Sequence, residues 1–255
     1  MNAVAAALVA IAVAGAGCCT VPQAPVPVAI EEFRSAQAAR VERTAAVWAT
    51  GTLELRWRDG DGAHFESADA QWWIERPGSM ALLLKKLGER MALAGCDGER
   101  AWVIDLRPKP ARLRTIERGD EPEGWAQALL PMHLAWLMGM EPLPASEPDR
   151  QWREGDLGWA QWAGRAIAWD RSGRPCAARV LVGARVAAES ALDAGQWRTI
   201  GGIDALPGHC SLRSPDHDAS ADLFLYEPSS FEPGSKDKLL RLGAIREAIM
   251  PEVVP

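Results

Sequence analysis

The stretch Gly51–Gly62, GTLELRWRDGDG, decides the fold. Its apolar residues Leu53, Leu55 and Trp57 alternate with charged residues, which is the period of a β-strand with one buried and one wetted face. The Asp-Gly pairs that follow are typical of a tight hairpin turn. The sequence therefore predicts a strand that turns back on itself at residues 59–62.

Runs with the same period continue along the chain. We expect six strands before a central helical segment and five to seven after it, at residues 52–58, 68–75, 80–84, 91–93, 102–106, 113–115, 158–163, 166–170, 176–182, 185–190, 196–200, 209–213 and 222–226. Because no helices of the length needed for parallel crossovers alternate with them, the strands should be antiparallel.

Three helical segments accompany the strands. Ile30–Val47 has an amphipathic pattern with Phe33, Val41 and Ala45 on one stripe, Glu123–Met140 has helical spacing interrupted by Pro131, and the last twenty residues predict a short helix. No Pro/Gly/Ser-rich linker divides the chain from residue 30 onward. We therefore expect one mainly β (α+β) domain over residues 30–255.

Composition excludes several classes of protein. The chain has 255 residues and a hydrophobic fraction of 48%, enough for a large core. With 28 Lys and Arg against 34 Asp and Glu, the net charge of −6 argues against a nucleic-acid partner. Twelve Trp against four Phe and one Tyr indicate a wide aromatic-lined surface.

The N-terminus reads as a signal peptide. Residues 1–17 hold an uncharged apolar run too short to span a membrane, which ends in Gly15-Ala16-Gly17 before Cys18. Small residues directly before a Cys resemble the bacterial lipobox, so we expect Cys18 to be lipidated and residues 18–29, rich in Pro, to form a tether. In lipoproteins of two-membrane bacteria, an Asp directly after the lipidated Cys is the best-known signal for retention in the inner membrane. Residue 19 is not Asp, so the resemblance implies the outer membrane, facing the periplasm. The alternative interpretation is a secretory signal peptide without lipidation.

The order of short motifs resembles the lipoprotein-localisation family, LolA and LolB. The resemblance rests on GTLEL at residues 51–55, WIERPG at 73–78, LLL at 82–84 before Leu87-Gly88, CDG at 96–98 before Ala101-Trp102-Val103, and Leu206-Pro207 before a late strand. It implies a curved antiparallel half-barrel of about eleven strands with helices plugging its open side. In that family the enclosed apolar cavity carries the acyl chains of lipoproteins or related lipids, such as palmitoyl groups.

The resemblance also suggests which residues contact ligand. The residues expected on the inner wall of the cavity are Leu53, Leu55, Trp57, Trp72, Ile74, Leu82, Leu84, Trp102 and Ile104, because they alternate with polar neighbours. Plain packing in a filled core would give the same period. Leu87 resembles the exposed loop residue by which LolB disturbs its acceptor membrane, with Lys85 and Lys86 near anionic head groups. An ordinary hairpin corner is the alternative.

Signals for catalysis, metals and cofactors are missing. The four His are scattered, and the sequence has no Cys-x-x-Cys, no Gly-x-Ser-x-Gly and no phosphate-binding Gly loop. His217 lies between two carboxylates, but Ser, Pro and Asp around it indicate a loop. A disulfide between Cys176 and Cys210 is one alternative, although buried free thiols are the simpler expectation.

Two functions remain in competition. The first is a non-catalytic outer-membrane lipoprotein that binds acyl chains of lipids or lipoproteins. The second is a lipid-tethered assembly or structural subunit whose half-barrel is filled by its own side chains and whose outer face docks an unidentified protein. An open apolar cavity favours the first, and a densely packed interior favours the second.

Overall fold

The computed structural model describes residues 27–75, 78–98, 100–117, 131–193 and 195–254. Its helices are α1 (Ile30–Arg43), α3 (Pro131–Leu137), η1 (Pro215–His217, a 3-10 turn), α4 (Asp237–Leu240) and α5 (Leu242–Ile249). Its strands are β1 (Ala46–Asp59), β2 (Gly62–Glu75), β3 (Ser79–Lys86), β4 (Glu89–Asp97), β5 (Arg100–Asp105), β6 (Arg112–Glu117), β7 (Arg150–Glu154), β8 (Leu157–Trp162), β9 (Arg165–Trp169), β10 (Pro175–Val182), β11 (Arg185–Leu192), β12 (Trp197–Ile200), β13 (Ile203–Pro207), β14 (His209–Ser214), β15 (Ala219–Leu225), β16 (Ser229–Ser230) and β17 (Glu252–Val253).

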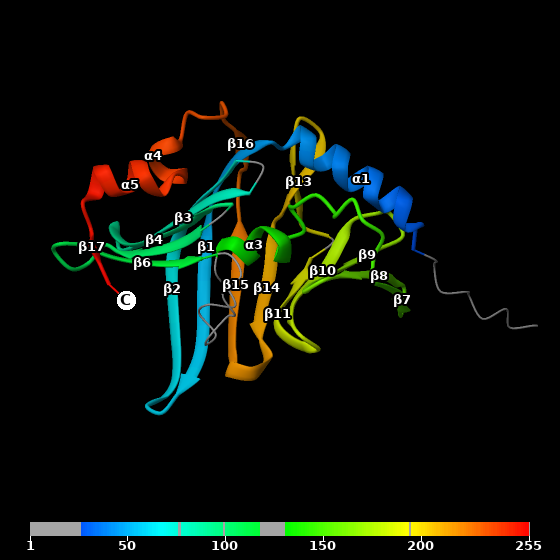
Figure 1. The fold of residues 1–255 in the computed structure, drawn as a ribbon, viewed down its shortest axis with the longest axis horizontal. Helices are drawn as coiled ribbons and strands as arrows, with labels where there is room; N and C mark the ends of the chain where they lie inside the picture. Colours follow the sequence, from blue (N-terminus) through cyan, green and yellow to red (C-terminus); the bar gives the residue numbers. More distant parts are fainter. Residues whose placement is uncertain (1–26, 76–77, 99, 118–130, 194, 255) are drawn as a thin grey trace, which may run out of the picture.

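One large open sheet dominates the molecule (Figure 1). Its order is β17-β6-β5-β4-β3-β2-β1-β15-β14-β11-β10-β9-β8-β7, with β16 paired to β1, and all neighbours are antiparallel except β17 and β6. The end strands β7 and β17 are not neighbours, so the sheet does not close. Within the described residues this sheet has 15 strands, more than the expected eleven or so, because short segments such as β7, β16 and β17 carry no periodic signal.

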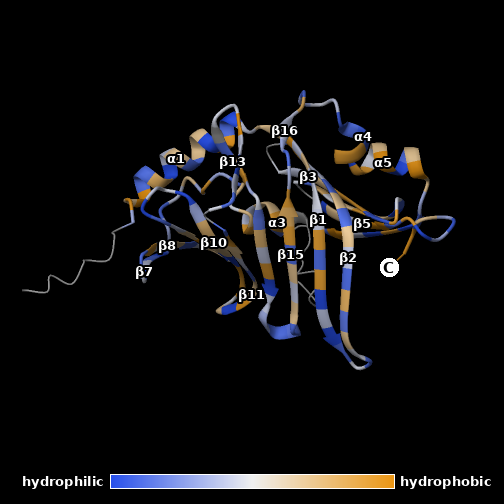
Figure 2. Ribbon diagram, turned by 180° about the vertical axis from the view of Figure 1, so that it is seen from behind, coloured by the Kyte–Doolittle hydropathy of each residue, from blue (hydrophilic) through white to orange (hydrophobic). Residues whose placement is uncertain are grey.

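The long hairpin β1–β2 fixes the two faces of the sheet. Its register is unbroken from Ala46 opposite Glu75 to Asp59 opposite Gly62. Because side chains alternate, odd-numbered residues of β1 and even-numbered residues of β2 share one face. Figure 2 shows the resulting alternation of hydrophobic and hydrophilic residues along β1 and β15. We call the face that contacts α1 and α3 the inner face and the opposite one the outer face.

Helix α1 is shorter than expected. It ends at Arg43, and the chain enters β1 at Ala46 instead of staying helical to Val47. The Thr44 hydroxyl donates to the Arg40 carbonyl oxygen at 2.8 Å, which closes the last turn. The buried side chains of α1 are Phe33, Gln37 and Arg40, whereas Ala45 is exposed and lies beyond the helix. The expected apolar stripe was therefore wrong after its first residue.

The remaining helical predictions are met in part. α3 covers the end of the predicted segment Glu123–Met140, whose first residues lie outside the described part. The C-terminal helix is present as the pair α4–α5. The signal peptide, Cys18 and the tether before residue 27 also lie outside the described residues. Within the described chain, no helix combines the length and apolarity needed to cross a membrane.

The helices α4 and α5 cover the outer face of β3–β6 and enclose a second core. Leu240, Leu242 and Ile245 pack there against Trp102 and Ile104, both 0% exposed. Gly95 lies opposite Trp102, and a Cβ atom at Gly95 would come within 2.5 Å of the indole and 2.7 Å of the Met80 carbonyl oxygen. The missing side chain of Gly95 is therefore the space that the Trp102 ring occupies.

Substituting Gly95 by Ala is expected to lower the free energy of unfolding by about 1–3 kcal/mol, because the new methyl group overpacks this core. Thermal unfolding followed by circular dichroism measures the change. Gly60→Ala is the matched control, since no atom lies within 4 Å of the point that a Cβ atom would take there, and its effect should stay within about 0.5 kcal/mol. Equal stability of Gly95→Ala and the control would contradict this packing.

Candidate functional site

The inner face gathers seven of the nine residues predicted to contact ligand. Cross-strand partners share a face, and the register aligns Ala49 with Trp72 and Leu82, and Val47 with Ile74. Leu84 stands opposite Ala70 on the same face. The odd positions of β1 add the remaining three predicted residues, Leu53, Leu55 and Trp57. The predicted alternation of β1, β2 and β3 is thus realised on a single wall.

Trp102 and Ile104 are not on that wall, so their predicted place was wrong. In the register Met80 stands opposite Cys96, which stands opposite Ala101, so Ala101 faces inward. Trp102 and Ile104 therefore point outward, beneath α4 and α5. Both faces of β5 are buried, and alternation alone does not say which face is the inner one.

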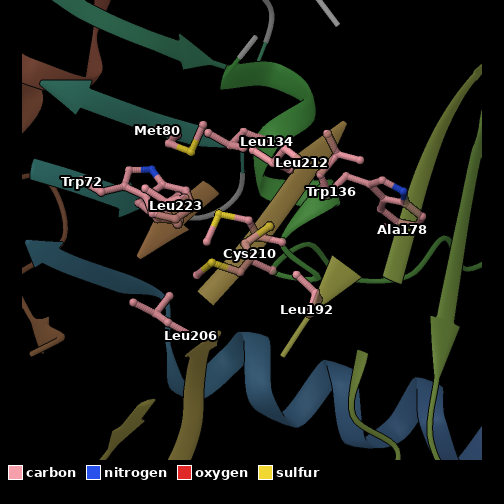
Figure 3. Close-up of a cluster of buried hydrophobic side chains, with 14 of the residues drawn as sticks. Trp72, Met80, Leu134, Trp136, Ala178, Leu192, Leu206, Cys210, Leu212 and Leu223 are labelled. Carbon is pink, nitrogen blue, oxygen red and sulfur yellow. The ribbon is translucent and has the colours of Figure 1, made fainter. Parts of the chain in front are cut away.

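Helix α3 packs into the hollow of the inner face. Figure 3 shows Leu134 and Trp136 of α3 among side chains from the strands, including Trp72, Met80, Leu212 and Leu223. The Trp136 indole Nε1 donates to the Ala166 and Arg179 carbonyl oxygens, both at 3.2 Å. The wall residues close to α3 are accordingly almost fully buried, with Trp72 at 1% and Leu82 at 7% exposure.

Helix α1 closes one end of the hollow. Phe33 stacks on Trp169 with ring centroids 4.6 Å apart, and the Trp169 indole donates to the Val28 carbonyl oxygen at 2.8 Å. The Gln37 amide donates to the Gly139 and Glu141 carbonyl oxygens, both at 2.8 Å, which ties α1 to the segment after α3. Entry from this end would break these contacts.

Arg40 is a buried cation in the same contact. It is 8% exposed, its guanidinium lies 5.1 Å from the Trp197 ring centroid, and it donates to the Gly173 carbonyl oxygen at 3.2 Å. Burial lowers the pKa of Arg40, although the nearby Asp204 carboxylate acts in the opposite direction. Sequence reasoning missed Gln37 and Arg40, because polar residues of an amphipathic helix are assigned to its solvent side.

The inner face opens toward the turn of β1–β2. Exposure rises along β1 from Leu53, at 8%, to the half-buried Leu55 and Trp57, and Leu84 is also half-buried. A pocket of about 430 Å3 lies over β11, β14 and β15, but most of its lining, including Glu189, Ser211 and Asp222, belongs to the outer face of the sheet. The half of the wall next to the β1–β2 turn, which we call its lower half, is therefore partly accessible, and beside Leu55 it carries Glu66, which is ion-paired with Lys86. The upper half is packed by α3.

Comparison with solved structures identifies this architecture. A LolA superfamily protein from Nitrosomonas europaea matches with a TM-score of 0.54 and 11% identity, over 82% of this chain and 97% of that one. A putative outer membrane lipoprotein-sorting protein domain from Vibrio parahaemolyticus matches with a TM-score of 0.58 and 8% identity, over 82% and 94% of the chains. The chain has a LolA-like fold.

A DUF1329 family protein from Desulfovibrio piger has a similar structure, with a TM-score of 0.53 and 8% identity over 86% of this chain and 99% of that one. No protein-family model matches the sequence, and no curated protein matches it. The arrangement of strands and helices is thus similar in these three structures, although the sequence identities are only 8 to 11%.

Leu87 occupies an unusual place in this LolA-like fold. It is 96% exposed at the turn between β3 and β4, and both Leu87 (φ 53°) and Gly88 (φ 84°) have positive φ. Two such residues in a two-residue loop are typical of a type I′ turn, for which Asn-Gly is the favoured sequence. A Leu there costs conformational energy and exposes an apolar side chain to water. Lys86 beside it is ion-paired to Glu66.

A Ser, His and Asp cluster lies on the outer face of β14 and β15. Ser211 Oγ donates to Asp222 Oδ1 at 2.7 Å, and His209 Nε2 lies 3.1 Å from the same oxygen and 3.4 Å from Ser211 Oγ. A hydrolase triad needs Ser and Asp on different nitrogens of the His ring. Here both face Nε2, so the cluster lacks that geometry. His217 lies in the turn η1, as the sequence predicts, and the described residues contain no group of metal ligands.

The three cysteines of the described chain are free thiols. The bridge left open between Cys176 and Cys210 is not formed, because β11 separates their strands β10 and β14. Cys96 and Cys210 are buried, and Cys176 is half-buried. Burial raises the pKa of all three thiols, to about 12 for Cys96 and Cys176.

Alkylation should report this burial. At pH 8 a thiol with a pKa of about 12 is ionised to on the order of 10⁻⁴, so iodoacetamide is expected to leave Cys96 and Cys210 unmodified in the folded protein. In guanidinium chloride both should react completely. Peptide mapping by mass spectrometry measures each site. A linked peptide pair containing Cys176 and Cys210 would contradict the free thiols.

Proposed function

We propose that the protein is a non-catalytic envelope lipoprotein that binds the acyl chains of lipoproteins or lipids on its inner face. The observation that carries the proposal is the apolar wall of β1–β3, which continues beyond the packed core to the half-buried Leu55, Trp57 and Leu84. The similarity of the fold to a LolA superfamily protein and to a lipoprotein-sorting domain supports it.

Burial of a hydrocarbon chain supplies the binding energy. Each CH2 group moved from water to an apolar surface contributes roughly 0.8 kcal/mol, so a chain of roughly 16 carbons gains on the order of 10 kcal/mol before ordering costs. No charged group is required on the wall. Binding therefore needs contact area, which the lower half of the inner face offers.

The proposed location rests on the N-terminal sequence. Lipidation of Cys18 would anchor the protein to the outer membrane, with residues 18–29 as the tether. The similarity to the outer membrane lipoprotein-sorting domain supports an envelope location. Acyl chains would then pass between the membrane and proteins that lie within reach of the tether.

A second function is favoured by the packing around α3. Leu134, Trp136, Leu137, Met138 and Met140 belong to the same buried cluster as the wall, so part of the hollow is filled by the chain itself. A lipid-tethered assembly subunit, which docks a protein and binds no lipid, would keep its interior filled in this way. The two functions differ in whether an acyl ligand binds at all.

The substitution Leu55→Asn should distinguish the acyl-binding function from the assembly function. If an acyl chain lies on the lower wall, this substitution places an unpaired amide against it, and the affinity for a fluorescent fatty acid should fall about tenfold. Thr52→Asn is the matched control, since Thr52 lies on the outer face of the same strand, and it should bind normally. A wild-type protein that takes up no acyl probe would favour the assembly subunit.

Leu87 offers a test of membrane contact. Leu87→Asn gives the Asn-Gly sequence preferred by a type I′ turn, so the free energy of unfolding should rise by about 0.5–1 kcal/mol. If Leu87 inserts into the acceptor bilayer, transfer of a bound acyl probe to anionic vesicles should become slower in the same variant. A more stable variant with unchanged transfer would mean that Leu87 is only a hairpin corner.

A further inference from the structure

A second pocket lies where β1 and β15 separate. The last paired residues of the two strands are Arg56 and Ser220, and beyond them the β1–β2 hairpin and the turn between β14 and β15 diverge. A pocket of about 580 Å3 occupies this seam. We call it the seam pocket; it is lined by Arg56, Trp57, Arg58, Ala63, His64, Phe65, Arg213, Asp218, Ala219 and Ser220. Its volume lies within the range of small-molecule sites.

Three arginines, two from β1 and one from β14, line the seam pocket on its outer side. Phe65, Arg56, Ser220 and Arg213 are successive cross-strand partners, so their side chains lie in one row on the outer face. Arg56 and Arg213 thus flank the short side chain of Ser220. Only one carboxylate, that of Asp218, belongs to the lining, in a chain whose net charge is −6.

The three guanidinium groups differ in how strongly nearby carboxylates already bind them. Arg56 is held by Asp222 and Glu54, each at 2.6 Å, and lies 5.2 Å from the centroid of the Phe65 ring. Arg58 makes a looser pair with Asp218 at 3.5 Å, in which both side chains are mostly exposed. Arg213 is exposed, and in the described part of the chain its guanidinium group forms no ion pair and no hydrogen bond. Arg213 is therefore the cation available to a ligand, and Arg58 is easily recruited.

The inner side of the seam pocket is aromatic. Trp57 and His64 are stacked with ring centroids 5.0 Å apart, and His64 Nε2 lies 2.8 Å from Asp59 Oδ1. Leu55, two residues before Trp57 on the same face of β1, begins the apolar wall. The seam pocket thus joins a cationic rim on the outer face to the accessible end of the inner face.

We propose that the seam pocket binds the phosphate-bearing anionic head group of an amphiphile whose acyl chain lies along the inner face. This rests on the proposed function and names the chemical class of its ligand. Arginine suits this role because its planar fork of donors matches phosphate oxygens. The half-buried rings of Trp57 and His64 lower the local dielectric constant relative to bulk water, which strengthens the charge interaction.

The experiment compares lysophosphatidylglycerol with a monoacylglycerol of the same acyl chain, both below their critical micelle concentrations, by isothermal titration calorimetry on the whole chain. Arg213→Gln should weaken binding of the anionic lipid about five- to tenfold and leave the neutral lipid unchanged. Arg114→Gln, an exposed strand arginine of β6 outside the seam pocket, is the matched control and should change neither. An Arg213→Gln effect that is equal for both lipids, or absent for both, would overturn the proposal.

A third ligand separates the possible sources of the phosphate group. Glycerol 3-phosphate should bind far more weakly than lysophosphatidylglycerol, and equal affinities would mean that the pocket serves a soluble phosphoester and not a lipid. If neither lipid binds but glycerol 3-phosphate does, and Arg213→Gln weakens it, the proposed acyl function fails while the anion site stands. If none of the three ligands binds, the seam pocket proposal is refuted together with the acyl function.

Discussion

The unbroken pairing of β1 with β2 is the constraint on which the rest of the structure depends. Its fourteen-residue strands keep one register over their full length, and a slip by one residue would move every apolar side chain to the opposite face. β3 and β15 continue this register on the two sides. The location of α1, α3 and both helices of the C-terminus follows, since each packs on whichever face that register makes apolar.

The hollow of the inner face is densely packed at one end and partly exposed at the other. Near α3 the side chains are packed as in any protein core, whereas toward the β1–β2 turn the same apolar wall becomes half-buried. Stability alone does not require large apolar side chains to continue past the point where the core ends. Leu55 and Trp57 lie beyond that point, as does the exposed Leu87 on a neighbouring hairpin. Such residues cost solubility, and under the proposed function a ligand or a membrane would offset that cost.

Much of this arrangement could be predicted from the sequence, because period two is a local signal. It located β1, β2 and β3 and the face shared by seven of the nine wall residues. It failed at Trp102, because β5 is buried on both faces and its outer cover, α4 and α5, comes much later in the chain. Gln37 and Arg40 were missed because their acceptors lie on distant segments, and Arg56 and Arg213 because only the sheet order places them in one row. Such groupings leave no motif, since a motif requires partners at a fixed short spacing.

The free ends of the sheet have a mechanical consequence. Because β7 and β17 are not hydrogen-bonded to each other, bending the sheet more or less tightly breaks no rung of its ladder. A closed barrel has a lumen whose width is set by strand number and stagger. Here the width of the hollow is set instead by side-chain contacts, such as that of Phe33 with Trp169. The ease with which the hollow widens or narrows therefore depends on side-chain packing. A single substitution can alter it while the backbone keeps its hydrogen bonds.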